Sequence, residues 1–250
     1  FLCGVPEGGV IFRSACVSKF KPMAILNMQH ITGASMPRSG HHLLHRLLSD
    51  YFAESFGYCS FYFPWEFDSF PECCGQIPCR KAATANFQVF LQKSHDFNLT
   101  DPVDGSSFRV VQVREPISRL FSNFQLHVKT NPKRNTRANF MNFATREYYY
   151  YVAFWMKWVR AENYVLTYEH LTLDPVGELE KLILAIGLEP NRNRIEDVAA
   201  SQLKISADNR AAFKPSKFRS HAFFDEKWAT EYARNIAKAC VGYETIVGGV

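Results

Sequence analysis

The stretch that decides the fold spans residues 31–52 and reads ITGASMPRSGHHLLHRLLSDYF. Its first five residues, ITGAS, contain no proline or charged residue and lead directly into a turn, which is compatible with a strand. A tight turn with a proline, a serine and a glycine follows at residues 36–40. Apolar residues then recur at the spacing of one helix face: Leu43, Leu44, Leu47, Leu48, Tyr51 and Phe52. This order of strand, turn and helix predicts the first unit of an α/β sheet.

The turn itself has the chemistry of an anion cradle. It reads Pro37-Arg38-Ser39-Gly40-His41-His42, at the carboxyl end of the predicted strand, where open α/β sheets bind ligands. The glycine lets the backbone approach an anion, and the first amides of the helix point toward it. The arginine adds a charged fork and the serine a hydroxyl donor. We therefore predict a phosphate or sulfate site, with an ordinary strand–helix turn as the alternative.

The cradle differs from a Walker A loop, which has two glycines five residues apart followed by Lys and Ser/Thr. Here Gly33 and Gly40 are seven residues apart and His41 follows. The magnesium-binding hydroxyl of that loop has no counterpart at this position. The sequence therefore argues against an ordinary ATPase or GTPase, and a kinase with a divergent P-loop stays as a rival.

Strand-like and helix-like segments alternate along the rest of the chain. This pattern predicts an α/β fold, namely a single three-layer domain with a mainly parallel central sheet flanked by helices, over residues 29–250. Residues 1–28 are expected to form an N-terminal arm or edge element. Strands are expected at 87–93, 108–113 and 164–167, and helices at 116–128, 140–160, 174–186, 194–202 and 226–240. Residues 57–80 and 206–223 read as irregular loops, the second one basic.

The composition limits the partners. The net charge of +5 over 250 residues suits an anionic ligand, and the short basic cluster near Lys133 does not indicate nucleic acid. The longest apolar run, residues 148–159, is too short to cross a bilayer, so no transmembrane segment is predicted. Seven cysteines favour reduced thiols and a cytoplasmic protein, although an N-terminal anchor lost from this chain is left open. Cys73, Cys74 and Cys79 cluster, but zinc would need a fourth ligand.

A second anion site is predicted where the strand at 108–113 ends. Arg114 follows that strand directly, and Ser122 lies eight residues later, about two helical turns. An arginine and a serine so placed would grip a second phosphate. The alternative is a surface ion pair between Arg114 and Glu115, with Ser122 exposed on its helix.

Taken together, these segments resemble the PAPS-dependent sulfotransferase family, in which PAPS is 3′-phosphoadenosine 5′-phosphosulfate. The family's phosphosulfate loop has the form P-[KR]-S-G, which residues 37–40 match. Its second signature, a strand-end Arg followed eight residues later by Ser, is matched by Arg114 and Ser122. The resemblance implies that the first motif holds the 5′-phosphosulfate and the second the 3′-phosphate, with no essential metal and with adenosine 3′,5′-bisphosphate (PAP) as product.

Further matches lie in the same order, over about residues 31–240. Residues 92–95 (QKSH) resemble the Lys-Thr-His strand end of the cytosolic branch, which implies His95 as catalytic base. Residues 151–171 resemble the family's aromatic helix and following strand, which implies that Tyr168 contacts the adenine. The late loop departs from the Phe-Arg-Lys-Gly pattern, so that Arg219 keeps a phosphate role while Lys214 or Lys217 replaces the missing lysine. His41 and His42 stand where two threonines are common, which leaves backbone amides or imidazoles as donors.

The chemistry also follows from the residue types. A base near neutral pH is needed to take the proton of an acceptor hydroxyl or amine, and imidazole titrates in that range. Lys93 shares strand parity with His95, so both face one cleft, and we assign Lys93 and Arg38 to the developing charge. His41, His42 and His45 are rival bases. The structural alternative is that His95 is a strand-end histidine whose hydrogen bonds are satisfied beside Asp96.

The acceptor stays open between a carbohydrate and a small molecule. The aromatic residues that follow the first helix line its pocket or belong to the core of a loop; they are Phe61, Tyr62, Phe63, Trp65 and Phe67.

Overall fold

The computed structural model describes residues 28–60, 76–79, 82, 86–103, 107–159, 163–212 and 225–239, with the side chains of 203–212, 226 and 239 left aside. The described strands are β1 Gln29–Ser35, β2 Phe56–Cys59, β3 Val89–Ser94, β4 Phe108–Val113 and β5 Tyr164–Thr167. The helices are α1 His41–Phe52, α2 Pro116–Thr130, α3 Arg137–Trp158, α4 Tyr168–Leu173, α5 Pro175–Ala185, α6 Arg192–Ala212 and α7 Glu226–Ala239.

The five strands form one sheet in the order β2-β3-β1-β4-β5, and all neighbouring pairs are parallel. The α/β prediction is therefore confirmed, and the described sheet is parallel throughout. After β1 the chain builds β2 and β3 on one side of it, then crosses to build β4 and β5 on the other. Such a reversal beside a central strand is where doubly wound sheets bind their ligands, which here is the carboxyl end of β1.

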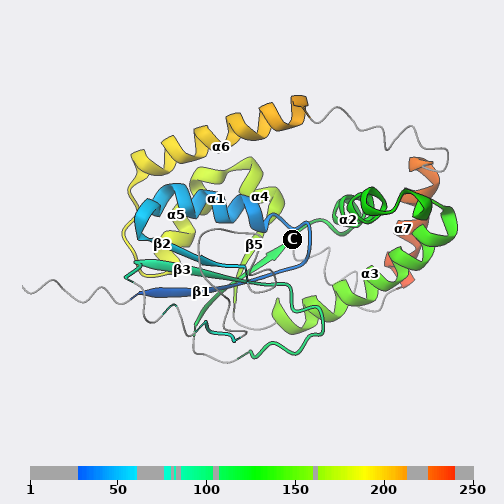
Figure 1. The fold of residues 1–250 in the computed structure, drawn as a ribbon, viewed down its shortest axis with the longest axis horizontal. Coiled ribbons are helices and arrows are strands. Elements are labelled where there is room, and N and C mark those ends of the chain that lie inside the picture. The colour runs from blue at the N-terminus through cyan, green and yellow to red at the C-terminus, as the bar shows by residue number, and fades with distance from the viewer. Residues whose placement is uncertain are drawn as a thin grey trace, which may run out of the picture.

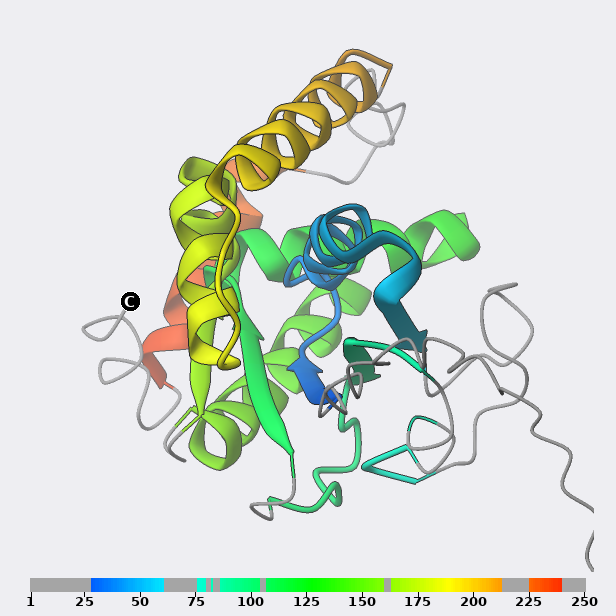
Figure 2. The ribbon, with the colours of Figure 1, turned by 90° about the vertical axis from the view of Figure 1, so that its left-hand side faces the viewer.

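Strand alternation sends apolar side chains to both faces of the sheet. Ile31 of β1 and Val110 of β4 pack with α1, α5 and α6, whereas Ala34 and Val111 pack against the aromatic residues of α3. The ribbon shows α1, α4, α5 and α6 over one face, with α3 on the other (Figure 1; Figure 2). The aromatic residues of α3 that cover this face are Tyr151, Phe154, Trp155 and Trp158.

Beside the sheet, α2, the first half of α3 and α7 pack as a lobe of their own (Figure 1). Phe124 and Phe140 form its centre, with ring centroids 5.0 Å apart, and three alanines of α7 close over it. The lobe matters for function because it fixes α2, which begins directly after the predicted second anion site.

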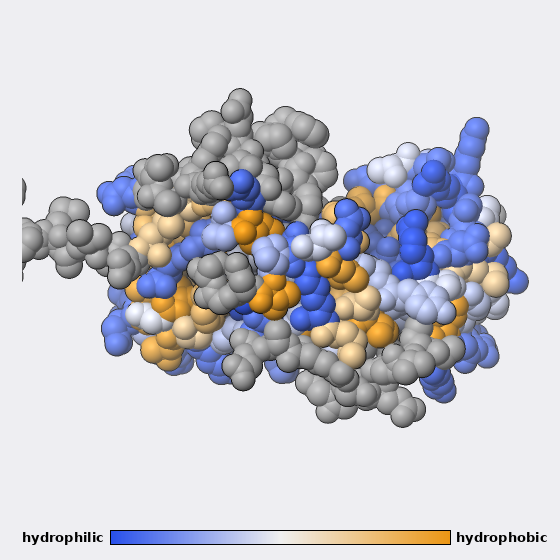
Figure 3. Space-filling view, turned by 90° about the horizontal axis from the view of Figure 1, so that it is seen from below, coloured by the Kyte–Doolittle hydropathy of each residue, from blue (hydrophilic) through white to orange (hydrophobic). Residues whose placement is uncertain are grey.

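On the face seen from below, hydrophobic side chains lie in separate clusters among hydrophilic ones (Figure 3).

Three expectations about elements need correction. Residues 56–59, which overlap the start of the expected loop, form β2, where Gly57 lies so close to Phe87 that a Cβ would meet its ring at 2.4 Å. A short helix, α4, follows β5 directly and begins at Tyr168. Helix α6 runs to Ala212 instead of ending near 202, because no Gly or Pro interrupts it. Residues 206–212 of the expected basic loop are therefore helical, and residues 213–224 lie outside the described part.

Other boundaries follow local chemistry as predicted. Asp174 caps α5 by accepting from the amide of Gly177, Pro175 occupies the first turn, and Gly187 follows the helix with φ 79°. Pro116 likewise opens α2. These signals lie within a few residues of the elements they terminate, which is why sequence alone locates them.

Candidate active site

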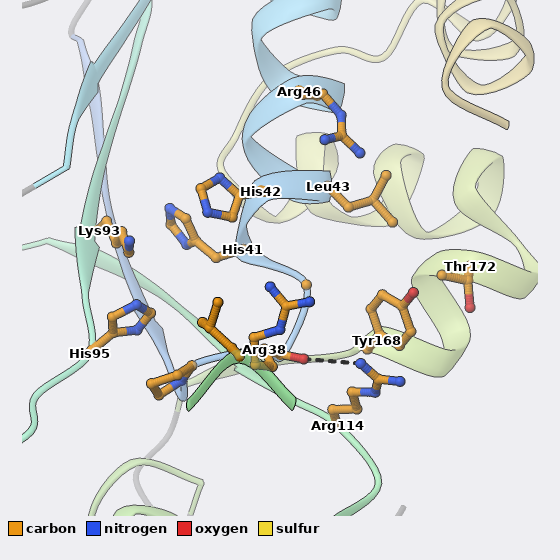
Figure 4. Close-up of a pocket in the computed structure, with 13 residues that line it drawn as sticks. Arg38, His41, His42, Leu43, Arg46, Lys93, His95, Arg114, Tyr168 and Thr172 are labelled. Atoms are coloured by element: carbon orange, nitrogen blue, oxygen red, sulfur yellow. Dashed lines mark hydrogen bonds between the residues drawn. The ribbon is translucent and has the colours of Figure 1, made fainter. Parts of the chain in front are cut away.

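A cavity of about 430 Å³ opens at the carboxyl ends of the central strands (Figure 4). Lys93 and His95 border it on the β3 side, Arg114, Tyr168 and Thr172 on the opposite side, and the start of α1 lies between them. The size fits a nucleotide-sized ligand. The lining residues are Pro37, Arg38, Gly40, His41, His42, Leu43, Arg46, Lys93, His95, Arg114, Leu126, Tyr168 and Thr172.

The loop after β1 has the conformation of an anion-binding turn. Gly40 caps α1 with φ 93°, and a Cβ there would lie 2.7 Å from the Tyr168 ring, so only glycine fits. Arg38 also has a positive φ, 71°, which an arginine adopts rarely. The Ser39 side chain is buried, and its hydroxyl has no hydrogen-bond partner among the described residues. Such an unsatisfied group at the start of a helix is the feature that a bound anion would complete.

The two histidines after Gly40 have different surroundings. His41 is 4% exposed and its Nε2 lies 3.2 Å from the hydroxyl of buried Tyr58. Burial, followed by the charge of Lys93, holds the pKa of His41 well below 6.5, so it is neutral. His42 is exposed and borders the cavity. His45 packs on Tyr58 at a ring distance of 4.1 Å, as expected of a packing residue, and burial lowers its pKa to about 4.

Arg114 lies at the carboxyl end of β4, as predicted, and joins three parts of the site. Its Nε donates to Ser118 Oγ at 3.2 Å, and one terminal nitrogen donates to the carbonyl of Arg38 at 3.3 Å. Its guanidinium carbon lies 4.5 Å from the centre of the Tyr168 ring. Glu115, the expected partner of a surface ion pair, instead caps α2 by accepting from the Ile117 and Ser118 amides.

Ser122 lies two turns along α2, and its hydroxyl accepts from Arg38 Nε at 2.9 Å. The two predicted anion sites are therefore in contact with each other through Arg38. The hydroxyl that contacts Arg114 is Ser118, one turn earlier, which the sequence reasoning missed. Because Arg114 precedes α2, which begins at Pro116, the i, i+4 rule for helical side chains gave no signal for Ser118.

Lys93 and His95 come from the end of β3, and both border the cavity, as strand parity predicted. The Nδ1 atom of His95 lies 2.5 Å from the carbonyl oxygen of Ser35. Because a carbonyl only accepts, Nδ1 carries the proton and Nε2 is the basic nitrogen. Burial, and next the charge of Lys93, lowers the pKa of His95 to about 3. The imidazole is therefore neutral at pH 7.

The electrostatics of the cavity fit a polyanion. The described lining contains Arg38, Arg46, Lys93 and Arg114 but no Asp or Glu. Desolvation, and next the charge of Arg114, lowers the pKa of the Arg38 guanidinium. Together with the unsatisfied Ser39 hydroxyl and the glycine cradle, this lining fits an anionic ligand.

The sequence reasoning also missed four lining residues. Arg46 lies one helical turn after His42 on α1 and donates from Nε to Gln202 of α6 at 2.8 Å. Leu43, on the same helix, gives the cavity an apolar wall beside Tyr168 (Figure 4). Leu126 and Thr172 reach the site only through the packing of α2 and α4. The i, i+4 spacing from His42 was a usable signal for Arg46.

Several predicted residues lie outside the described part of the chain. They are Arg219 with its alternatives Lys214 and Lys217, the aromatic residues at 61–67, and Cys73 and Cys74. Cys79 belongs to the described part and is buried. Among the described residues, no group of His, Cys, Asp and Glu side chains is arranged to hold a metal ion. Within the same residues, no helix is both long and apolar enough to cross a membrane.

Comparisons with known proteins give the class of fold. Models of protein families and curated proteins yield no match to the chain. Among solved structures, the chain is similar to a mouse sulfotransferase complexed with PAP, with TM-score 0.52 and 20% identity over 70% of this chain. It is also similar to a retinol dehydratase in complex with androsterone and the inactive cofactor PAP, with TM-score 0.53 and 16% identity over 86% of this chain.

The matches cover 63% of the mouse chain and 82% of the retinol dehydratase chain. This chain is therefore an α/β protein with the sulfotransferase fold. The fold class predicted from residues 31–52 and the strand–helix alternation is confirmed, and so is the resemblance at the level of fold.

Proposed function

We propose that this protein is a sulfotransferase that moves a sulfuryl group from PAPS to a hydroxyl or amine of a small-molecule or carbohydrate acceptor. The observation that carries the proposal is the cavity at the carboxyl end of β1, with cations and no carboxylate in its described lining and with Lys93 and His95 on one side. The sulfotransferase fold supports the same assignment.

The nucleotide would be held from both sides of the cavity. The amides at the start of α1, the Ser39 hydroxyl and Arg38 would bind the 5′-phosphosulfate. Arg114 would hold the 3′-phosphate with Ser118 or Ser122, and Tyr168 would lie against the adenine. Arg219 is proposed to contribute to the phosphate site as well. PAPS supplies the activated sulfuryl group, and none of the proposed roles uses a metal.

His95 is proposed as the general base. Its Nε2 would take the acceptor's proton as the acceptor oxygen or nitrogen bonds to sulfur and the bond from sulfur to the phosphate oxygen breaks. The electron pair of that bond leaves on the phosphate oxygen, where Lys93 and Arg38 would stabilise the developing charge. Since the tautomer set by Ser35 leaves Nε2 basic, the ring is in the form that the step requires.

The pKa of about 3 in the ligand-free protein makes His95 a weak base. A bound polyanion beside Lys93 would offset the lysine charge that contributes to this low value, and so raise the pKa toward the useful range. His41 is a poorer candidate because it is buried against Tyr58. His42 is exposed at the cradle and remains the competing base.

The acceptor class rests on the structural neighbour alone. Because the retinol dehydratase was solved with androsterone, a small hydrophobic alcohol is the first acceptor to screen. Carbohydrate acceptors come second. The expected location in the cytoplasm stays a prediction.

Two other functions compete with this one. A kinase with a divergent P-loop would bind ATP with magnesium at the same cavity, although the Lys-Ser/Thr pair of a Walker A loop is missing. A non-catalytic nucleotide- or polyanion-binding module would bind without transfer. The joint presence of Lys93 and His95 in the cavity favours an enzyme over such a module.

The test is calorimetric titration with PAP in the absence of magnesium, with ATP as the comparison ligand. We expect micromolar PAP binding, weakened about 10- to 100-fold in Arg114→Ala because a charge-assisted bond to phosphate is lost. Arg134→Ala is the matched control, since Arg134 is exposed and contacts His127 away from the cavity. Binding of ATP only with magnesium, and none of PAP, would place the kinase first.

A further inference from the structure

The turn that follows β3 is unusually well held for a surface connection. His95 stands at its start, Asp96 has φ 43° and Leu99 has φ 55°. Aspartate adopts such angles more readily than most residues, whereas a leucine does so only where surrounding contacts impose them. The turn closes on itself, because the amide of Leu99 donates to the Asp96 carbonyl at 2.9 Å and the amide of Asp101 donates to Asp96 Oδ1 at 2.9 Å.

The Asp96 carboxylate anchors this turn to the last turn of α3. Its side chain is fully buried, and Oδ2 accepts from Lys157 Nζ at 2.6 Å and from the Trp158 indole at 2.8 Å. Lys157 also donates to the carbonyl of Asp101 at 2.6 Å. Asp96 is thus engaged by α3 and by its own turn.

A second residue of α3 reaches His95 itself. The hydroxyl of Tyr150 donates to the backbone carbonyl of His95, and the Tyr150 ring stacks on Phe97 at 6.5 Å between centroids. Phe97 in turn lies 5.3 Å from the His95 ring. The backbone of His95 is therefore tied to α3, while its Nδ1 is tied to Ser35 of β1.

We propose that Tyr150, supported by the Lys157–Asp96 pair, is a positioning residue that fixes the ring orientation and tautomer of His95. Tyr150 acts on the His95 backbone and not on the ring, so its effect on transfer passes through His95. When the carbonyl of His95 is held, the short contact from Nδ1 to Ser35 is kept and Nε2 faces the cavity. This inference rests on the proposed role of His95 as the base.

The test compares Tyr150→Phe with Tyr149→Phe. Both variants remove one hydroxyl from neighbouring tyrosines of α3, but Tyr149 is 68% exposed and Tyr150 contacts His95. The first readout is the tautomer of His95, measured from its ¹⁵N shifts in the ligand-free protein. The wild type and Tyr149→Phe should show mainly the Nδ1-protonated form, and Tyr150→Phe a mixture.

The second readout is turnover. In Tyr150→Phe we expect kcat to fall about three- to tenfold with the Kd for PAP unchanged, as for the loss of one orienting hydrogen bond. Lys157→Met should shift the tautomer in the same direction. Lys157→Arg, which keeps the positive charge, should show the wild-type tautomer. An unchanged tautomer in both Tyr150→Phe and Lys157→Met, in folded protein, would overturn the proposal.

The two proposals fail in different ways. If PAP does not bind and no transfer occurs, the sulfotransferase assignment fails, while the tautomer measurement still decides whether α3 orients His95. If transfer occurs and kcat is equal in Tyr150→Phe and Tyr149→Phe, the positioning role fails and the proposed function stands.

Discussion

The loop after β1 and the loop after β3 both border the same cavity, but they are built in opposite ways. The β1 loop, residues 36–40, carries an exposed Arg38, a glycine in the left-handed region and a buried Ser39 hydroxyl with no partner among the described residues. The β3 loop, residues 94–101, is cross-linked internally and to α3 by the contacts of Asp96 and Tyr150.

The difference separates two tasks. A loop with uncompensated charge and an unsatisfied donor gains its missing interactions from an anionic ligand, so its residues should govern affinity. A loop whose polar groups are satisfied by the protein holds a fixed geometry before any ligand arrives, so its residues should govern turnover. Substitutions in the two loops should therefore affect different quantities.

The largest effect is expected from His95→Asn, at the start of the β3 loop. Loss of a general base should lower kcat about 10²- to 10⁴-fold, while the Kd for PAP changes little. Steady-state kinetics with a small alcohol acceptor, together with calorimetry, measure both. The same kcat as wild type would remove His95 from the mechanism and point to His42, whose variant His42→Asn is the companion test.

Lys157→Met should have the largest effect on stability. It leaves the buried Asp96 carboxylate without its cation, which should lower the free energy of unfolding by about 3 kcal/mol. Urea unfolding followed by circular dichroism measures the change. Lys181→Met is the matched control, because the Lys181–Glu178 pair is solvent-exposed at the lysine and should show no measurable change. Equal stability of the two variants would mean that the turn is not anchored through Asp96.

In the β1 loop, Gly40→Ala should weaken PAP binding about tenfold or more. The added Cβ meets the Tyr168 ring at 2.7 Å in a backbone conformation that alanine rarely adopts, which should also cost about 1–3 kcal/mol of stability. Gly187→Ala is the control, since Gly187 has φ 79° with nothing within 4 Å of a Cβ. Gly187→Ala should lose part of the stability that Gly40→Ala loses and should keep its affinity for PAP. If Gly187→Ala weakened PAP binding as much as Gly40→Ala does, the clash with Tyr168 would not be the cause.

The smallest effect is expected from Ser39→Ala. The hydroxyl is buried and has no hydrogen-bond partner in the described part of the chain, so its removal should leave the unfolding free energy unchanged or slightly higher. The Kd for PAP should rise about three- to tenfold through the loss of one donor. Thermal unfolding with and without PAP separates the two quantities. A variant that loses stability but keeps its affinity would assign Ser39 to structure instead of binding.

The sequence predicted the parts of the site that depend on one strand and the turn after it. Residues 37–40, Arg114 and His95 each follow a strand directly, and parallel strands bring their carboxyl ends together at one edge. What the sequence did not predict depends on contacts between distant elements. Ser122 was paired with Arg114 by spacing, yet its hydroxyl contacts Arg38, 84 residues away, because α2 packs across the β1 loop.

The sequence by itself thus determined the α/β class, the glycine cradle and the order of the residues proposed to bind anions, because periodicity, turn chemistry and caps act over a few residues. Only the tertiary structure decided the tautomer of His95, the burial of His41 and the anchoring of Asp96 by α3. Each of these depends on which groups replace water around one side chain, and those groups come from elements up to 62 residues away.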